Sequence, residues 1–494
     1  MDAIIQGFTL LFHFQNILLI FGGVIIGVIV GALPGLSSPM AIALLLPFTI
    51  GLDPVAAISM MAALYCAGTF GGSITAILIN APGAPPAVAT AFDGYPMAKK
   101  GQPGKALGLA TIASVIGGIF SLIVFIFATP LLASVALSFG PVEYFGLAVF
   151  ALSMLASMSG KSSIRNLIAG CVGVLIATIG VHLATGVERF DFGVEELTEG
   201  IHFVPVLIGL FAMSELLTQS QTLDAVMQRM SAKSLKLPSW KELKQLKWCI
   251  LRSSGLGTFI GVLPAEGSTV AAMMGYNEAK RWSAKPELFG TGCAEGIVAP
   301  ESANNAAAGG AMVPTLALGI PGSGTTALIL AALVMHGFKP GPYLITETPH
   351  LVYAIFGAML IANFGFLGIG LVGAKVFSYV TFIPKKFLWP SVFVFSLIGS
   401  YSFSSSMFDV WVMLLSGIIG FFMMRNGFSP APLVMGLILG PMVEETFTQG
   451  MVIHDSSFFQ FFESGVFLIF MGLTVVSLSS PFWSGIRKAF TSKK

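Results

Sequence analysis

Long apolar runs recur along the 494-residue chain and determine its predicted architecture. A membrane-spanning helix needs roughly 20 mostly apolar residues. Windows of this kind occur at residues 17–33, 106–128, 142–158, 164–183, 201–219, 350–372, 388–402, 407–424, 430–443 and 460–480. Because these runs lack the period-two alternation of barrel strands, a closed β-barrel is excluded. The pattern predicts an all-α polytopic membrane protein with about 11–13 membrane segments.

Two further intervals, 34–94 and 253–337, are apolar but rich in Gly, Pro, Ser and Thr. They contain the stretches I-N-A-P-G-A-P-P-A (79–87) and L-G-I-P-G-S-G-T-T (318–326). Proline removes an amide donor and blocks the preceding helical turn, while glycine permits a reversal of the backbone. Freed backbone groups are tolerated at membrane depth only where they are buried in protein or line a wet cavity. We therefore expect discontinuous or re-entrant helices, although a simple kink in a packed helix is the alternative for either motif alone.

The charged residues support a membrane location and indicate an orientation. The chain is 55% hydrophobic and 10% charged, whereas soluble proteins have about 25% charged residues. Of the 25 basic residues, 23 gather in a few loops and in the C-terminal tail, and only Arg189 and Lys339 fall elsewhere. The positive-inside rule places those loops and the C-terminus in the cytoplasm, and the N-terminus and the acidic loops 188–199 and 443–447 on the periplasmic side. The formal charge of +2 does not indicate nucleic-acid binding. A signal peptide is not expected, because the N-terminal residues lack the basic n-region that would begin one.

An internal repeat relates the two polar intervals. The stretch at 31–41 matches the stretch at 261–271 as G-x-L-P-x-x-x-S-x-x-A. Further along, Gly71-Gly72 corresponds to Gly309-Gly310, and Pro82-Gly83-Ala84 corresponds to Pro321-Gly322-Ser323. Since the charge pattern places corresponding loops on opposite sides, we expect two inverted-topology repeats. The predicted halves are residues 1–220 and 253–494, joined by a cytoplasmic linker at 221–252 whose basic amphipathic part, 236–248, lies on the membrane surface.

The broken segments are the predicted substrate site. Two breaks near the bilayer midplane would present amides, hydroxyls and the positive N-terminal ends of half-helices, all of which favour an anion. Neither broken segment contains Lys or Arg, so a polyanion would depend on these groups and on bound cations. Some of the hydroxyls are expected to bond only to carbonyls of their own helices. The candidate substrate-binding residues are Ser37, Ser38, Pro82, Gly83, Ala84, Ser268, Asn304, Asn305, Pro321, Gly322, Ser323 and Thr325.

A second set of polar residues is suited to cation coupling. It comprises Thr69, Ser73, Asn80, Glu266 and Glu301. An ionisable residue in apolar surroundings is a functional candidate, and either glutamate could hold Na⁺ or carry a proton. In the structural alternative, Glu301 binds amides at a helix start after Pro300, and the adjacent asparagines bond to neighbouring helices. Na⁺ is the only metal ion that these residues are expected to bind, and no cofactor is expected. We interpret the four cysteines and His182, His202 and His336 as packing or interfacial residues.

Three stretches carry a resemblance to a known family. They are A-P-E-S-A-N-N-A-A-A-G-G-A (299–311), L-A-L-G-I-P-G-S-G-T-T (316–326) and G-T-F-G-G-S-I-T-A-I-L-I-N-A-P-G (68–83). Together they resemble the large membrane subunit of the tripartite tricarboxylate transporters, the TctA family. The resemblance implies a bacterial inner-membrane permease that works with a small four-helix, TctB-like membrane subunit and a periplasmic, TctC-like solute-binding protein. It also implies uptake of tri- or dicarboxylates such as citrate, coupled to a Na⁺ or H⁺ gradient.

The sequence also bears on two other function classes. An intramembrane enzyme is not expected, because the sequence contains neither HExxH nor GxSxG and no convincing Ser/His/Asp group. Another organic-anion transporter or a channel is harder to distinguish, since broken helices also build pores. Saturable uptake that requires an ion gradient and a binding protein would separate a transporter from a channel.

Overall fold

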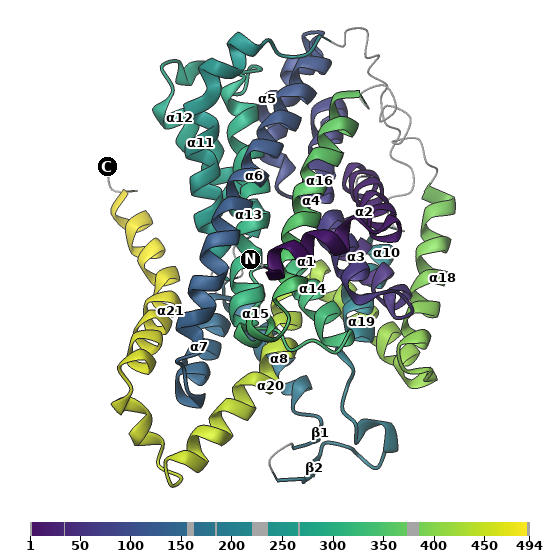
Figure 1. The fold of residues 1–494 in the computed structure, drawn as a ribbon. Helices are drawn as coiled ribbons and strands as arrows, with labels where there is room; N and C mark the ends of the chain where they lie inside the picture. The colour runs from purple at the N-terminus through teal and green to yellow at the C-terminus, as the bar shows by residue number, and fades with distance from the viewer. Residues whose placement is uncertain are drawn as a thin grey trace.

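The computed structural model describes residues 2–33, 35–155, 163–182, 185–219, 236–264, 267–372 and 385–491, and these are almost entirely helical (Figure 1). Helices before residue 220 are α1 (Asp2–Leu11), α2 (Phe14–Ala32), α3 (Ser38–Leu45), α4 (Pro54–Ile79), α5 (Ala87–Lys99), α6 (Pro103–Ala136), α7 (Pro141–Met154), α8 (Ser163–Ala177), α9 (Phe203–Ile208) and α10 (Ser214–Gln219). Later helices are α11 (Trp240–Val262), α12 (Gly267–Trp282), α13 (Glu295–Leu318), α14 (Gly324–Met335), α15 (Pro342–Glu347), α16 (Pro349–Val372), α18 (Lys385–Ser404), α19 (Met407–Arg425), α20 (Pro430–Ile453) and α21 (Gly465–Thr491).

Shorter elements complete the described chain. A π-helical turn, Gly209–Met213, joins α9 to α10. The 3₁₀ turns are Leu46–Thr49, Glu195–Leu197, Pro286–Leu288 and Phe458–Glu463. The strands β1 (Gly180–Val181) and β2 (Glu188–Arg189) pair antiparallel, with Gly180 opposite Arg189. They form a small hairpin at one end of the molecule (Figure 1).

Five of the described helices are long and apolar enough to cross a bilayer: α2, α4, α6, α16 and α19. Shorter apolar helices occupy Ser38–Thr49, Pro141–Met154, Ser163–Ala177, Phe203–Gln219, Gly324–Met335 and Gly465–Ser479. In α4, 94% of the apolar window is buried inside the protein, compared with 33% in α19. Helix α4 is therefore a central element and α19 a peripheral one, and the prediction of an all-α polytopic membrane protein is confirmed.

The central helices form two matching pairs, α2 on α4 and α11 on α13. Glycines permit both contacts, since a Cβ atom at Gly71 would lie 3.0 Å from the Cα of Gly31, and one at Gly310 would lie 3.1 Å from the Cα of Gly261. Small residues allow helix backbones in membranes to approach closely. The pairs then interlock, because α6 packs on α13 and α16 packs on α4. Each long helix thus supports the broken helix of the other half.

The two helix breaks share one backbone geometry. Helix α4 ends at Asn80 (φ 54°) and α13 ends at Gly319 (φ 71°), both left-handed. In each case the following amide donates back into the helix at 3.3 Å, from Ala81 to Thr75 and from Ile320 to Pro314. Both pairs are offset by 239 residues, the same offset that relates the Pro-Gly motifs.

That offset corrects one detail of the repeat read from the sequence. The glycines that meet the first helix of each pair are Gly71 and Gly310, so Gly71 corresponds to Gly310 and not to Gly309. The division at residues 220 and 253 and the inverted relation of the halves stay predictions, because much of the linker lies outside the described residues.

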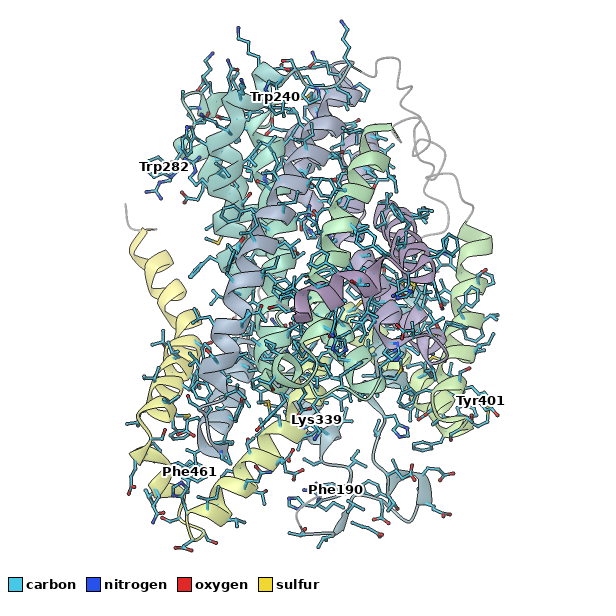
Figure 2. All side chains as sticks on the ribbon, viewed as in Figure 1. Phe190, Trp240, Trp282, Lys339, Tyr401 and Phe461 are labelled. Atoms are coloured by element: carbon cyan, nitrogen blue, oxygen red, sulfur yellow. The ribbon has the colours of Figure 1, made fainter. Side chains whose placement is uncertain are left out.

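Charged and aromatic side chains mark two ends of the molecule. Figure 2 shows Trp240 and Trp282 toward one end, and Phe190 and Phe461 toward the other. Near Trp240, the Lys105 ammonium ion-pairs with Glu242 and, together with the amide of Ser239, lowers the pKa of that carboxyl to about 2. This contact joins the start of α6 to the start of α11, within the region that the charge pattern predicts to be cytoplasmic.

A buried aspartate fastens the loop between α12 and α13. Asp93 on α5 accepts hydrogen bonds from the amides of Gly290 (2.9 Å), Gly292 (2.8 Å) and Cys293 (2.7 Å), and from the Tyr276 hydroxyl (2.9 Å). Its side chain is fully buried. The sequence does not reveal this role of Asp93, because most of its hydrogen-bond donors are backbone amides about 200 positions away.

Replacing Asp93 with Asn is expected to lower the free energy of unfolding by about 2–4 kcal/mol, because hydrogen bonds to charged groups are worth about 1.5–3 kcal/mol each. The amide NH₂ of asparagine would also face amide donors. Thermal unfolding of the purified protein in detergent measures the effect, with Glu278→Gln as a control at a partly exposed position. Equal melting temperatures for Asp93→Asn and the control would contradict the structural role.

Candidate functional site

A cavity of about 370 Å³ lies between the two broken regions. Its walls come from α3 and α4, the break that follows α4, the starts of α12 and α14, and the residue before α20. The lining residues are Ser37, Ser38, Pro39, Tyr65, Thr69, Ala84, Pro85, Pro86, Gly267, Ser268, Thr269, Ser323, Gly324, Thr325 and Ser429. The two motifs that are distant in sequence thus meet at one site.

Five helices begin at this cavity: α3, α5, α12, α14 and α20, the last through its cap residue Ser429. The start of α14 has the most developed cap, since Ser323 Oγ accepts from the amide of Thr326 (3.2 Å) and Thr326 Oγ1 accepts from the amide of Ser323 (2.9 Å). No described residue accepts from the amides of Gly324 and Thr325. These amides are available to a ligand, and helix N-termini carry partial positive charge.

Helix α5 is the equivalent of α14 in the first half, but its first amides already have partners. The first amides of α5 bond to the carbonyls of the break itself, Ala87 to Ala84 (3.0 Å) and Val88 to Pro85 (3.3 Å). At α3, the Ser37 hydroxyl accepts from the amide of Met40 at 3.4 Å. The amide donors are therefore more available in the second half than at α5.

The described lining contains hydroxyls but no Asp, Glu, Lys, Arg or His side chain. Tyr65 projects from α4, and its hydroxyl lies 3.5 Å from Ser323 Oγ, across the two halves. Sequence reasoning missed Tyr65, although the 239-residue offset makes it the counterpart of Asn304. It also missed Ser429, which tertiary packing alone brings to the cavity.

The structure separates the predicted substrate residues into two groups. Those that line the cavity are Ser37, Ser38, Ala84, Ser268, Ser323 and Thr325. Those that lie outside the lining are Pro82, Gly83, Asn304, Asn305, Pro321 and Gly322. The glycines build the breaks: the amide of Gly83 donates to the Gly72 carbonyl (3.1 Å), and that of Gly322 donates to Thr315 Oγ1 (3.2 Å).

The adjacent asparagines lie in different places. Asn304 Nδ2 donates to the carbonyl of the cavity residue Thr69 (3.2 Å), while its buried Oδ1 has no partner among the described residues. Asn305 Nδ2 donates to the Glu301 carbonyl (3.3 Å) and faces a small polar space shared with Asn363. Asn304 therefore lies behind the cavity wall, and Asn305 belongs to a separate region.

The predicted cation-coupling residues do not all lie at the cavity, although Ser73 and Glu301 interact with each other. Thr69 lines the cavity, Ser73 is buried on the same helix, and Asn80 is an exposed cap of α4. Glu301 is fully buried and accepts from the hydroxyls of Thr90 and Ser114. Glu266 lies outside the described residues.

Another cavity, of about 340 Å³, lies beside the β1–β2 hairpin and α20. Arg189 binds both carboxylate oxygens of Glu444 there, and this ion pair raises the pKa of the guanidinium above its usual value. His182 Nε2 lies 3.6 Å from the same carboxylate. Arg189, one of the two basic residues outside the predicted cytoplasmic loops, thus has an acidic partner and stabilises the hairpin against α20.

Comparison with known proteins gives consistent matches. The model of the tripartite tricarboxylate transporter TctA family matches residues 17–435. An uncharacterized 52.8 kDa protein in the TAR-I ttuC' 3' region of Agrobacterium vitis is 40% identical over 441 residues, covering 89% of this chain and 87% of that protein. An uncharacterized protein in the TAR-II ttuC' 3' region of the same organism is 38% identical over 225 residues, covering 45% of this chain and 93% of that protein. No solved structure matches the chain. Since the family model spans most of its length and both broken motifs, this multi-pass membrane protein belongs to the tripartite tricarboxylate transporter TctA family.

Proposed function

We propose that the protein is the permease of a binding-protein-dependent secondary transporter that imports tri- or dicarboxylates across the bacterial inner membrane, driven by a Na⁺ or H⁺ gradient. The observation that carries the substrate class is the cavity, where five helix starts and several hydroxyls surround a space without charged side chains in its described lining. Family membership supports the tripartite organisation.

Helix ends can supply affinity without a fixed cation. A charge at a helix N-terminus is stabilised by about 0.3–1 kcal/mol, and by up to about 2 kcal/mol in partly buried geometry. The four helix starts other than α5, whose first amides already have partners, therefore contribute roughly 1–8 kcal/mol, which overlaps the range of about 4–8 kcal/mol for millimolar to micromolar binding. A di- or tricarboxylate can contact both halves at once, which a monocarboxylate cannot do as well.

We further propose that a small TctB-like membrane subunit and a periplasmic TctC-like binding protein complete the system. Uptake of radiolabelled mono-, di- and tricarboxylates into cells that express all three components tests this proposal. We expect saturable uptake of di- or tricarboxylates that disappears without the binding protein or without an ion gradient. Non-saturable flux that needs neither would indicate a channel and contradict the proposal.

The proposed orientation predicts opposite labelling of two single cysteines. In a background without the native cysteines, Lys236→Cys should react with a membrane-impermeant thiol reagent only in inverted vesicles, and Glu196→Cys only in intact spheroplasts. Both positions are exposed, and they lie on opposite sides according to the positive-inside rule. Labelling of both from the periplasm would reject the orientation.

A further inference from the structure

Glu301 is a buried acid at the contact of α13 with α5 and α6. Its Oε1 accepts from Thr90 Oγ1 at 2.5 Å and its Oε2 accepts from Ser114 Oγ at 2.8 Å, and the side chain is 0% exposed. No described Lys, Arg or His forms an ion pair with it. Burying a carboxylate without a cationic partner costs free energy, so packing alone does not explain why Glu301 lies among these hydroxyls.

The partners of Glu301 are hydroxyls, which both donate and accept hydrogen bonds. When the acid is ionised, both hydroxyls donate to it. When it is protonated, its own O–H can donate to one hydroxyl while the other still donates to the remaining oxygen. The surroundings of Glu301 therefore satisfy both protonation states.

Asp93, one turn from Thr90 on α5, provides an internal contrast. It accepts from three backbone amides, which can only donate, in addition to the Tyr276 hydroxyl. Of the two buried acids in this region, Glu301 is the one whose hydrogen-bond partners among the described residues are all hydroxyls.

Few other ionisable groups lie near Glu301. The nearby stretches of α6 (around Ser114 and Gly117) and α11 (around Gly257) carry none. The buried ionisable groups on the other packed helices are Tyr65 and Cys66 on α4, Asp93 on α5 and Tyr276 on α12. None of them is hydrogen-bonded to Glu301 among the described contacts, so a change in its charge would be felt mainly by the polar groups toward the cavity.

A short polar connection joins Glu301 to the cavity. Asn304 lies one turn further along α13, and its Nδ2 donates to the carbonyl of Thr69, a cavity residue. The Oδ1 of Asn304 is buried, at 1% residue exposure, and has no partner among the described residues. Asn304 thus connects the cavity wall at Thr69 to the turn of α13 that carries Glu301.

We propose that Glu301 binds the coupling proton, an inference that rests on the proposed carboxylate transport. A negative substrate in the cavity disfavours a second negative charge at Glu301, so substrate binding promotes protonation of its carboxylate oxygen. By linkage, protonation increases the affinity for the substrate to the same degree. One O–H bond forms on one side of the membrane with a proton from water, and the proton returns to water on the other side after the substrate leaves.

Glu301→Gln tests the proposal in proteoliposomes that contain the small subunit and are supplied with the binding protein. The amide has nearly the shape of the protonated acid but cannot release a proton. We expect Glu301→Gln to retain citrate exchange within about threefold of wild type, while accumulation driven by an acid-outside pH gradient falls at least about tenfold, to the equilibrium level. Glu278→Gln, which alters an exposed ion pair with Arg281, serves as the matched control.

A binding measurement in detergent gives a readout that does not depend on transport. The affinity of the wild type for citrate should fall as the pH rises, by at most about tenfold per pH unit for one proton. Because citrate itself titrates, the ratio of wild-type to Glu301→Gln affinity in the same buffers isolates the contribution of Glu301. We expect this ratio to fall with rising pH.

Several outcomes would overturn the proposal. They are pH-driven accumulation by Glu301→Gln at the wild-type level, a pH-independent affinity ratio, or wild-type accumulation under a Na⁺ gradient without proton movement. If Glu301→Gln does not fold, Ser114→Ala decides: it removes a donor that stabilises the ionised acid, so the pH dependence of citrate affinity should shift to higher pH, and an unchanged profile would refute the role. Absence of saturable carboxylate uptake by the complete wild-type system would instead refute the proposed function itself.

Discussion

Ser268→Asp is expected to weaken carboxylate binding by roughly a hundredfold. The position lies in the cavity at the start of α12 and is partly exposed, so a slightly larger side chain fits. A new carboxylate about 5 Å from a bound one costs about 3 kcal/mol at an effective dielectric constant of about 20, which corresponds to that factor. The concentration for half-maximal uptake measures the effect.

Ser268→Asn separates charge from size, because asparagine has nearly the volume of aspartate and is neutral. We expect a change of less than about tenfold for this control, since it alters one polar contact. If the Asp and Asn variants show the same half-saturation, the cavity does not bind the anion, and the electrostatic account fails.

Gly322→Val should abolish uptake, and Gly322→Ala should reduce it by at least about tenfold. A Cβ atom at Gly322 would lie 2.6 Å from the carbonyl oxygen and 2.8 Å from the Cα of Ala311, closer than real contacts permit. The break must then move away from α13, which displaces the neighbouring cap at Ser323 and the free amides of α14. A misplacement of about 1 Å in a positioned binding group is enough for losses of this size.

The control for the glycine variants is Gly368→Val on α16, where an added Cβ meets nothing within 4 Å. It should express and transport as wild type does. Fluorescence-detected size-exclusion chromatography establishes that the Gly322 variants are folded. Normal uptake by Gly322→Val would reduce the Pro-Gly motif to a kink without a role in the site.

Local backbone chemistry explains why much of the site could be predicted from the sequence. Pro and Gly within apolar segments reveal a helix break directly. Ser37 and Ser323, which the sequence suggests as substrate-binding residues, both line the cavity, and the structure adds that both cap helices. The hydrophobic pattern likewise predicted an all-α membrane protein, because burial of backbone polar groups in lipid leaves few other solutions.

The other features of the site depend on the direction of each side chain about its helix axis and on the packing of distant helices. Neither can be read from the sequence. Adjacent residues on a helix point about 100° apart, and the sequence does not show that Asn304 faces the carbonyl of Thr69 while Asn305 faces the space shared with Asn363. Tyr65 lies in a mainly apolar part of α4, before the polar positions Thr69 and Ser73. Ser429 reaches the cavity through the packing of α20 near α14. The role of Asp93 was hidden for the same reason, as its donors are backbone amides of a distant loop.

The central claim is that the cavity between the broken helices binds the carboxylate. Its most direct test is substrate protection of Thr269→Cys, a cavity position, in a background without the native cysteines. Alkylation of this cysteine should slow when citrate or another transported carboxylate is added, at the concentrations that half-saturate uptake, and should not respond to the neutral triamide of citrate. Alkylation that proceeds at the same rate while uptake saturates would show that the carboxylate binds elsewhere.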